Sequence, residues 1–418
     1  MLFLHLVALF LGGCATAPKP LPTTSSNEPV LVTVKETRAT PTIELLFPDT
    51  DFRVALVSDL NGRYGSTTYG DDVHAALARI LEMRPSLVVS VGDMVAGQKA
   101  GLDYPLMWEA FHSTFSDPLK EAGIPFAIIP GNHDASAFPE FAEEREHYAA
   151  AWEERMPQVD WVDSAHYPFY YAFEHKGVLM LALDATVPGP LDAEQRGWLR
   201  GVLSNAPVSQ PKLMFSHLPL VSFTERKRTD TVRDPELEQM IRDYGVEIFV
   251  SGHHHSYYEA RVDGIRMLSV GCLGGGPQPL YGQEERSPKT LLVLERAPNG
   301  ELRTEALVGA SFNRLMAAES LPSWLPGSQR LVLRYGRESL PNDTALAMSQ
   351  AAFSLPRAWL ASNALEEQQA DTDTLAQVDP SEERDEASTI DVETALPRLR
   401  VLLRGLDSTM SFRPTPQD

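Results

Sequence analysis

The sequence lacks a hydrophobic run long enough to cross a membrane as a helix. Its one apolar stretch near the start, Met1–Leu11, is well short of the roughly 20 residues that such a helix needs, and no internal segment reaches that length. Hydrophobic residues nevertheless make up 43% of the 418 positions. Because a usual domain has roughly 100–200 residues, the chain has room for one large domain with a substantial core, and for extensions.

Positive charge is also scarce. The 36 lysines and arginines are outnumbered by 57 acidic residues, which gives a formal net charge of −21. The segment Glu366–Glu393 contributes −10 of this charge, because its eleven acidic residues are accompanied only by Arg384. The rest of the chain carries about −11 and offers no basic surface for DNA or RNA, which argues against long nucleic acids as partners.

Cysteine is limited to Cys14 and Cys272. Cys14 ends the tetrapeptide Leu11-Gly12-Gly13-Cys14, which follows the apolar start and resembles the lipobox of bacterial lipoproteins. The resemblance implies that residues 1–13 are a signal peptide and that a lipid on Cys14 anchors the chain to an extracytoplasmic membrane face. Cys272 would then have no partner for a disulfide and is predicted to be a small buried residue. The alternative is an apolar N-terminus with an incidental cysteine.

The composition and hydrophobic pattern of the sequence predict one globular domain between less regular segments. Residues 14–48 are rich in Pro, Thr and Ser and are predicted to be a flexible linker. Strand-like and helical runs then alternate, which predicts an α/β domain over residues 49–310. A C-terminal extension over 311–364, an acidic disordered linker over 365–395 and a tail over 396–418 are predicted to follow.

The individual elements are predicted from hydrophobic periodicity. The expected helices are Asp72–Met83, Trp108–Ala122, Ala193–Leu203 and Pro235–Tyr244, with Thr344–Phe353 and residues 396–413 as further candidates. The expected strands are Arg53–Ser58, Leu87–Val91, Phe126–Ile129, Phe169–Phe173, Val178–Leu183, Lys212–Phe215, Glu247–Val250 and Leu331–Arg334. Four more, Tyr257–Val262, Arg266–Val270, Thr290–Leu294 and Leu302–Leu307, are expected to form antiparallel pairs that close one flank.

Polar motifs follow five of the predicted strands. They are Ser58-Asp59-Leu60-Asn61, Gly92-Asp93-Met94, Gly131-Asn132-His133-Asp134, Ser216-His217-Leu218-Pro219 and Gly252-His253-His254-His255. Residues just past the carboxyl ends of parallel strands converge on one crevice, so we expect these side chains to meet. Asp59 and Asp93 could instead cap nearby helices, the usual role of such residues.

These residue types suit a site with two metal ions. Carboxylates neutralise and bridge two cations, while imidazoles and an amide oxygen complete their coordination. Two ions roughly 3.5–4 Å apart hold the attacking and leaving oxygens of an in-line displacement, and they turn a bridging water into hydroxide at neutral pH. The pattern therefore predicts phosphoryl chemistry.

The order of the motifs resembles that of the calcineurin-like metallophosphoesterase superfamily, whose pattern runs D-x-H, G-D, G-N-H-[DE], H and G-H-x-H. The resemblance covers roughly residues 50–310 and implies a four-layered αββα sandwich. It also implies metal ligands, with Asp59 and His255 on the first ion, Asp93 as the bridge, and Asn132, His217 and His253 on the second. His133 would be the general acid that protonates the leaving group, and Asp134, the second catalytic candidate, would polarise or support the site.

Asn61 departs from this family pattern, because it occupies the place of the histidine in D-x-H. Its amide oxygen is a hard, neutral ligand, which favours Mn²⁺ or Fe over Zn²⁺. Three outcomes are open: Asn61 binds the first ion, a water takes its place, or the first site is empty and the protein is impaired. Binding by Asn61 is the favoured outcome.

Two further residues are candidates for substrate contact. Arg63 lies in the loop Gly62–Ser66 and could reach a substrate phosphate, although the loop could equally be only flexible. His254 lies between two predicted ligands, and its side chain points the opposite way if the backbone there is extended.

The resulting function hypotheses are of different classes. The leading one is an extracytoplasmic phosphoesterase that hydrolyses a phosphomonoester or a small phosphodiester. The alternatives are a non-catalytic lipoprotein scaffold with a degraded metal site, or a nuclease.

Overall fold

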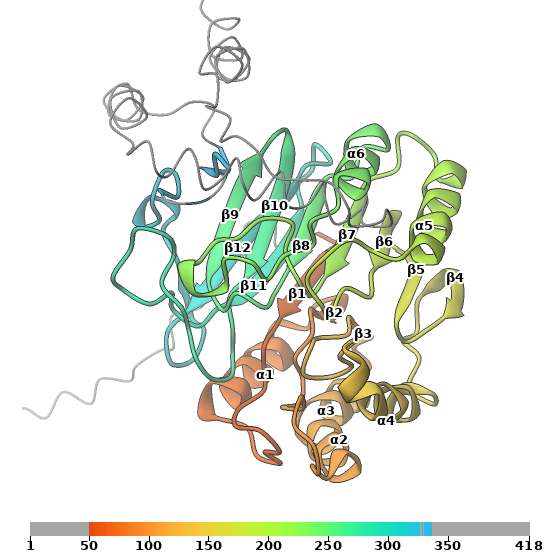
Figure 1. Cartoon of the computed structure of the whole chain (residues 1–418). Helices are drawn as coiled ribbons and strands as arrows, with labels where there is room; N and C mark the ends of the chain where they lie inside the picture. The colour runs from red at the N-terminus through yellow and green to blue at the C-terminus, as the bar shows by residue number, and fades with distance from the viewer. Residues whose placement is uncertain (1–49, 327, 329, 337–418) are drawn as a thin grey trace, which may run out of the picture. The chain divides into compact units, whose positions relative to one another are not determined.

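The computed structural model describes residues 50–326, 328 and 330–336. Two β-sheets face each other in the middle of this region, and helices cover their outer faces (Figure 1). This arrangement confirms the predicted α/β class and the layers of the αββα sandwich. No helix of the described region is both long and apolar enough to cross a membrane.

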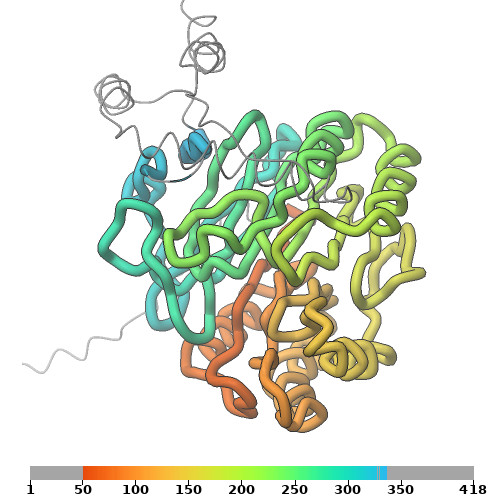
Figure 2. The backbone as a smooth tube through the Cα atoms, viewed as in Figure 1, coloured from red at the N-terminus to blue at the C-terminus, as the bar shows by residue number. Residues whose placement is uncertain are grey.

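The first sheet has six strands in the order β13-β12-β11-β1-β2-β3. Their bounds are β1 Arg53–Val57, β2 Leu87–Ser90, β3 Phe126–Ile128, β11 Leu291–Arg296, β12 Leu302–Val308 and β13 Arg314–Leu315. Strands β1, β2 and β3 are parallel, whereas β11 is antiparallel to both β1 and β12. Strand β1 therefore lies beside a strand from much later in the chain (Figure 2), and its Arg53 pairs with Glu295, 242 positions away.

The second sheet has eight strands in the order β14-β9-β10-β8-β7-β6-β5-β4. Their bounds are β4 Asp160–His166, β5 Tyr170–His175, β6 Val178–Ala182, β7 Lys212–Ser216, β8 Ile248–Ser251, β9 Tyr257–Val262, β10 Ile265–Val270 and β14 Leu333–Arg334. Strands β6, β7, β8 and β10 are parallel, and antiparallel strands extend the sheet on both sides.

The helices lie on the outer faces of the two sheets. Beside the first sheet are α1 Asp71–Met83, α2 Tyr104–Phe111, the π-helical turn η1 His112–Ser116, α3 Asp117–Glu121 and α4 Ala142–Trp152. Beside the second are α5 Ala193–Asn205 and α6 Pro235–Asp243. Short 3-10 turns occur at η2 Pro139–Phe141, η3 Glu225–Lys227 and η4 Ala318–Ser320.

Alternation of side chains along β1 produces the layers. Val54 and Leu56 pack in the core that also contains residues of β6, β7 and β8, so they face the second sheet. Ala55 and Val57 pack in the other core, with residues of α1 and α2. Because successive side chains of a strand point to opposite faces, a strand that is buried on both sides must be apolar throughout.

Most of the predicted elements are present, with three corrections. The helix predicted over Trp108–Ala122 begins earlier, at Tyr104, because Asp103 caps it through the N–H of Leu106, and it is divided into α2, η1 and α3. The last four strands of the predicted domain form two hairpins in different sheets, β9–β10 and β11–β12, rather than one flank. Strand β4 and helix α4 are additional to the prediction.

The folded region continues past residue 310, since β13 pairs with β12 and β14 pairs with β9. Cys272 is fully buried, as predicted. Several predictions lie outside the described residues: the signal peptide over 1–13, Cys14, the linker over 14–48, the helix Thr344–Phe353, the acidic linker over 365–395 and the tail over 396–418.

Candidate metal centre

All five motifs lie at the carboxyl ends of parallel strands, and both sheets contribute. Strands β1, β2 and β3 lead to the first three motifs, and β7 and β8 lead to the last two. Four predicted ligands have left-handed backbone conformations: φ is 51° at Asp59, 56° at Asp93, 64° at His253 and 53° at His255. Non-glycine residues rarely adopt this conformation, and such residues concentrate at functional sites.

Two groups of side chains are arranged to hold metal ions. Asp59, Asp93 and His255 form one group, and Asp93, His217 and His253 form the other, with ligand atoms within 4.8 Å of one another in each. Asp93 belongs to both groups. This is the arrangement expected of a carboxylate that bridges two ions.

The first group is held by hydrogen bonds to its outer atoms. Asp59 Oδ2 accepts from the hydroxyl of Ser58 at 2.7 Å and from the N–H of His253 at 3.1 Å. His255 Nδ1 lies 3.0 Å from the carbonyl oxygen of Gly275. Because a carbonyl only accepts, Nδ1 carries the proton, and Nε2, 3.0 Å from Asp59 Oδ1, is the ring nitrogen that is left for a metal ion.

The second group centres on His217, which is fully buried. Its Nδ1–H donates to the carbonyl oxygen of Val91 at 2.7 Å, which leaves Nε2 for a metal ion. Nε2 lies 3.0 Å from Asn132 Oδ1 and 3.3 Å from both Asp93 Oδ2 and His253 Nδ1. The structure thus brings together all four residues that the resemblance implies for the second ion.

Two residues that the sequence did not single out contact His253. Asp230 Oδ2 lies 3.4 Å from His253 Nε2, and the ammonium group of Lys227 donates to the His253 carbonyl. Both come from the loop that follows β7. Neither residue belongs to one of the five motifs, and only the fold brings this part of the loop to the site.

Electrostatic interactions within the centre keep its buried carboxylates charged. Burial opposes ionisation of Asp93, but His217 and His133 outweigh it and hold the pKa of Asp93 well below its usual range. Burial also opposes charging of His255, yet Asp59 raises the pKa of His255 to about 10. In contrast, burial together with Lys227 places the pKa of His253 well below its usual range.

Two carboxylate oxygens show that the donor set fits metal ions. Asp59 Oδ1 and Asp93 Oδ2 are buried, and the polar atoms that they face are ring nitrogens, His255 Nε2 at 3.0 Å and His217 Nε2 at 3.3 Å, rather than backbone or hydroxyl donors. Buried carboxylate oxygens are normally paired, so such atoms need an explanation. Cations bound between the imidazoles and carboxylates would satisfy both atoms.

Asn61 is buried beside the first group, and its orientation is fixed by the loop after β2. Its side-chain Nδ2 donates to the carbonyl oxygen of Val95 at 3.2 Å, and its backbone N–H donates to the carbonyl oxygen of Asp93 at 3.1 Å. Because Nδ2 is used in this way, the amide oxygen is the side-chain atom of Asn61 that is left for a metal ion. An amide oxygen is therefore available next to Asp59 and Asp93.

His133 adjoins the predicted ligands, and its ring is held by the loop after β2. The backbone N–H of His133 donates to Asp93 Oδ1 at 2.8 Å, and the ring Nδ1 lies 3.0 Å from the carbonyl oxygen of Gly97. Since that carbonyl only accepts, Nδ1 carries a proton. Nε2 is then the atom that would gain or release a proton in a reaction.

The part of the chain that forms this site is similar to a known family. Residues 52–257 match the family model described as calcineurin-like phosphoesterase. The chain contains a calcineurin-like phosphoesterase domain. The matched range begins at β1 and ends at the start of β9, so it includes all five motifs.

Individual relatives are distant from this chain. Purple acid phosphatase 15 of Arabidopsis thaliana is 24% identical over 226 residues, which cover 49% of this chain and 40% of the relative. Purple acid phosphatase 23 of the same plant is 27% identical over 232 residues, which cover 49% and 47%. The chain thus spans less than half the length of these curated relatives.

Solved structures give matches of similar distance. A purple acid phosphatase from yellow lupin (Lupinus luteus) seeds has 16% identity and a TM-score of 0.49, covering 63% of this chain and 52% of that one. A dimetal phosphatase from Danio rerio has 15% identity and a TM-score of 0.43, covering 63% and 97%.

Asp134 of the phosphoesterase domain joins two loops of the site. Its carboxylate accepts from the N–H groups of Met94 at 2.8 Å, Val95 at 2.9 Å and Gly131 at 2.9 Å, and it is fully buried. Burial and the nearby Asp93 raise the pKa of Asp134 to about 7, although these N–H donors oppose the rise. Its contacts are with backbone, so its support of the site is structural.

The two predicted substrate contacts lie in different surroundings. His254 is fully buried, with Nδ1 accepting from the N–H of Phe223 at 3.2 Å and Nε2 lying 3.1 Å from the carbonyl oxygen of Asp230. Both ring nitrogens of His254 are therefore used to hold the loop after β7, and neither is left for a substrate. Arg63 is exposed on the loop after β1.

Glycines of the phosphoesterase motifs allow the strand ends to approach closely. A β-carbon at Gly131 would lie 2.1 Å from the backbone nitrogen of Asp93, and one at Gly252 would lie 2.0 Å from the hydroxyl of Ser58. Neither position has room for a side chain. The glycines before Asn132 and His253 are thus needed for the ligands to meet.

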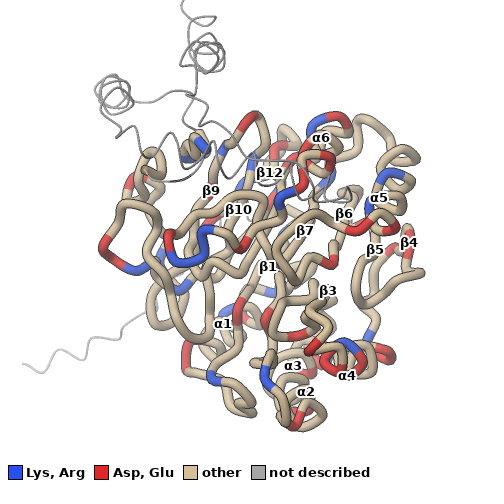
Figure 3. Tube along the Cα trace, in the orientation of Figure 1, with Lys and Arg blue, Asp and Glu red and all other residues tan. Residues whose placement is uncertain are grey.

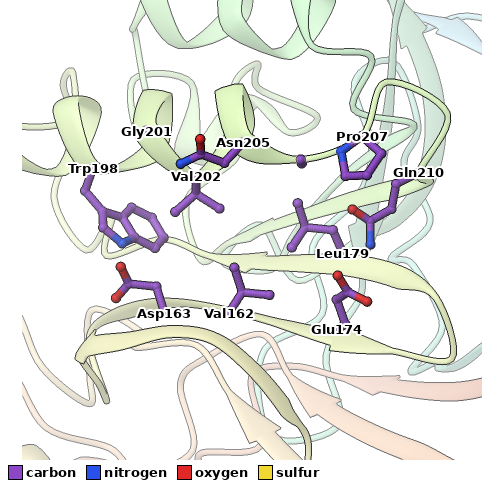
Figure 4. Close-up of a pocket in the computed structure, with 11 residues that line it drawn as sticks. Val162, Asp163, Glu174, Leu179, Trp198, Gly201, Val202, Asn205, Pro207 and Gln210 are labelled. Atoms are coloured by element: carbon purple, nitrogen blue, oxygen red, sulfur yellow. The ribbon is translucent and has the colours of Figure 1, made fainter.

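A separate cavity of about 340 Å³ lies between α5 and strands β4 and β5 at the end of the second sheet (Figure 4). Trp198, Val202 and Leu179 line it together with the carboxylates Asp163 and Glu174. None of the predicted site residues borders this cavity, so it is distinct from the candidate metal centre.

Proposed function

We propose that this chain is a metal-dependent phosphoesterase that hydrolyses a phosphomonoester or a small phosphodiester at the candidate metal centre. The observation that carries the proposal is the pair of ligand groups that share Asp93, with His133 directly beside them. A site that only bound metal would have no use for an adjacent imidazole with a free ring nitrogen.

The residues divide the work between binding and proton transfer. Asp59, Asp93 and His255 would hold one ion, and Asp93, Asn132, His217 and His253 the other. When bound, the ions would neutralise the phosphoryl charge and activate water for attack. His133 would hold a proton on Nε2 and release it to the leaving oxygen of the ester, while its Nδ1–H bond to Gly97 keeps the ring in place.

Asn61 bears on the choice of metal. An amide oxygen in place of an imidazole favours Mn²⁺ or Fe over Zn²⁺, although Zn²⁺ is compatible with the remaining ligands. A non-catalytic scaffold is the second candidate function, because weaker binding at the first site would leave the centre incomplete.

A small substrate suits the surface better than a long nucleic acid does. On the face shown in Figure 3, acidic and basic segments are interspersed. Binding to nucleic acid depends on neutralising many phosphates, and the net charge of −21 opposes it. A nuclease is therefore the less favoured form of this chemistry.

We also propose that the phosphoesterase acts outside the cytoplasm, tethered to a bacterial membrane by a lipid on Cys14. The lipobox-like sequence supports this proposal. Mass spectrometry of Cys14 after membrane extraction would test it, and an unmodified thiol in membrane-free protein would contradict it.

Metal content and turnover, measured together, test the activity. The purified protein should bind two ions per chain by elemental analysis and hydrolyse p-nitrophenyl phosphate or bis-p-nitrophenyl phosphate with added Mn²⁺. The preferred ester separates a monoesterase from a diesterase. One ion or none, without turnover in excess metal, would favour the scaffold.

A further inference from the structure

An exposed aromatic ring lies against the proposed general acid. Tyr64 is 57% exposed, and its ring centre is 5.5 Å from that of His133, with the two planes inclined by 56°. Most of the contact surface of this tyrosine is therefore open to solvent at the edge of the metal centre.

The loop that carries Tyr64 is fixed on both sides of it. On the N-terminal side of Tyr64, the backbone N–H of Asn61 donates to the carbonyl oxygen of Asp93 at 3.1 Å. On its C-terminal side, the backbone N–H of Gly65 donates to the carbonyl oxygen of Ala96 at 2.9 Å. Gly65 has φ of +75°, and a β-carbon there would lie 2.9 Å from Leu102 Cδ2, so the turn requires glycine. Tyr64 is thus attached to the segment that also contains the bridging carboxylate.

The same segment positions His133, through the carbonyl of Gly97. Tyr64 and His133 are consequently held in register with each other and with Asp93. In ester hydrolysis, the group that protonates the leaving oxygen lies next to the leaving group. A ring in contact with His133 therefore borders the space that the leaving group must occupy.

We propose that Tyr64 determines specificity by stacking on a flat aromatic or heterocyclic leaving group. This inference rests on the proposed function of the metal centre. An aromatic pair contributes a modest energy beyond burial of area, which corresponds to roughly a 2- to 10-fold preference for such esters over alkyl esters of similar charge.

The test compares binding with turnover in matched variants of the full chain. With Mn²⁺ present, calorimetry measures the affinity for phenylphosphonate and methylphosphonate, which cannot be hydrolysed as esters. Steady-state kinetics with phenyl phosphate and glycerol 2-phosphate follow. The variants are Tyr64→Ala, Tyr64→Phe and Tyr64→Leu, with Tyr170→Ala as control, because Tyr170 stacks on His166 at 4.2 Å at the edge of the second sheet.

The expected result is that Tyr64→Ala and Tyr64→Leu lose the roughly 2- to 10-fold preference for the phenyl ligand, mainly through KM, while Tyr64→Phe and Tyr170→Ala keep it. An equal change for phenyl and alkyl ligands would overturn the inference, as would no change or the absence of any preference in the unaltered protein. Failure of the proposed function differs from this, because turnover would be missing while the preference in phosphonate binding persists.

Discussion

His133 and Asp93 are adjacent, but substitution of the two residues should have different effects on metal content and turnover. His133→Ala removes the proposed proton donor without removing a ligand, so metal content should stay near that of the unaltered protein while kcat falls by roughly 10²- to 10⁴-fold. Asp93→Ala should lose both ions, because both ligand groups contain Asp93. Elemental analysis and kinetics of the two variants test this.

His74 offers a matched control, since it is an exposed histidine on α1. His74→Ala should leave both metal content and kcat unchanged. An unchanged rate in His133→Ala would remove its assigned role, and retention of both ions in Asp93→Ala would show that Asp93 is not the bridge.

Gln98 determines which atom of the Asn132 amide faces the metal ligands. Asn132 Nδ2 donates to Gln98 Oε1 at 2.9 Å, and this leaves Asn132 Oδ1 turned toward His217. Gln98 is itself held, because its backbone N–H donates to Glu144 and its Nε2 donates to Ser136 at 3.2 Å. Partners of this kind commonly change metal affinity by roughly 10- to 100-fold.

Gln98→Ala should therefore weaken binding of the second ion by roughly 10- to 100-fold, with little effect on the first. Titration with Mn²⁺ measures both affinities. The exposed Gln239, which donates to Asp243 on α6, supplies the control variant Gln239→Ala. Equal affinities in Gln98→Ala and the control would mean that Asn132 needs no such partner.

At the scale of elements, the hairpin β11–β12 contains a titratable pair. Burial and the neighbouring Glu295 raise the pKa of Glu305 to about 7, from an ordinary value of 4.5. Below pH 4.5 the side chain is protonated in both folded and unfolded chains. As pH rises from there through about 7, the unfolded chain releases the proton first, so this group lowers the free energy of unfolding.

Glu305→Gln should remove this decrease in the free energy of unfolding at high pH. The melting temperature of the variant, relative to that of the unaltered protein, should be higher at pH 8 than at pH 5.5. Glu301→Gln, in the turn between the same two strands, is the control, because its bond to Arg303 lowers the pKa of Glu301 and predicts no gain at pH 8. A pH-independent difference for Glu305→Gln would show that the carboxyl is not titrating there.

The elements differ in how well their sequences predicted them. Strand β9 has its predicted bounds, because it ends at a turn that contains Gly264. Helix α4 was missed because its sequence, AEEREHYAAAW, has no clear apolar stripe and buries Glu144. Strand β4 was missed because it is an edge strand with mostly polar residues.

The site was predictable to the extent that its residues lie in motifs. Asp59, Asp93, Asn132, His133, His217, His253 and His255 gather as the pattern predicts. Gln98, Lys227 and Asp230 were not predictable, since they reach the site from loops whose course depends on the whole fold. His254 was ambiguous because its place beside two ligands gives no information about its own partners.

At the scale of the molecule, the folded unit is longer than the part that resembles the family. The match ends at Tyr257, but β1 pairs on one side with β11, from Arg53↔Glu295 to Leu56↔Leu292. The N–H of Gly274 also donates to the carbonyl oxygen of Asp59 at 2.7 Å. The first metal group therefore depends on residues beyond the match.

A chain that ends at Pro288 should accordingly fail to fold cooperatively and should bind no metal with high affinity. A chain that ends at Gly336 keeps every described residue and should retain both properties. Thermal unfolding and elemental analysis of the two chains test this. A cooperative transition in the shorter chain would show that β11 is not needed beside β1.

Because β1 pairs with β11, a newly made chain cannot complete the first sheet until Glu295 has been synthesised. Ribosomes add roughly 5–20 residues per second, so the 242 positions between Arg53 and Glu295 correspond to about 10–50 s during which β1 waits for its partner. Throughout that interval its apolar edge is open to other strands. The chain should therefore need protection by a chaperone until residue 295 is present, and this need should end once the hairpin β11–β12 closes the sheet.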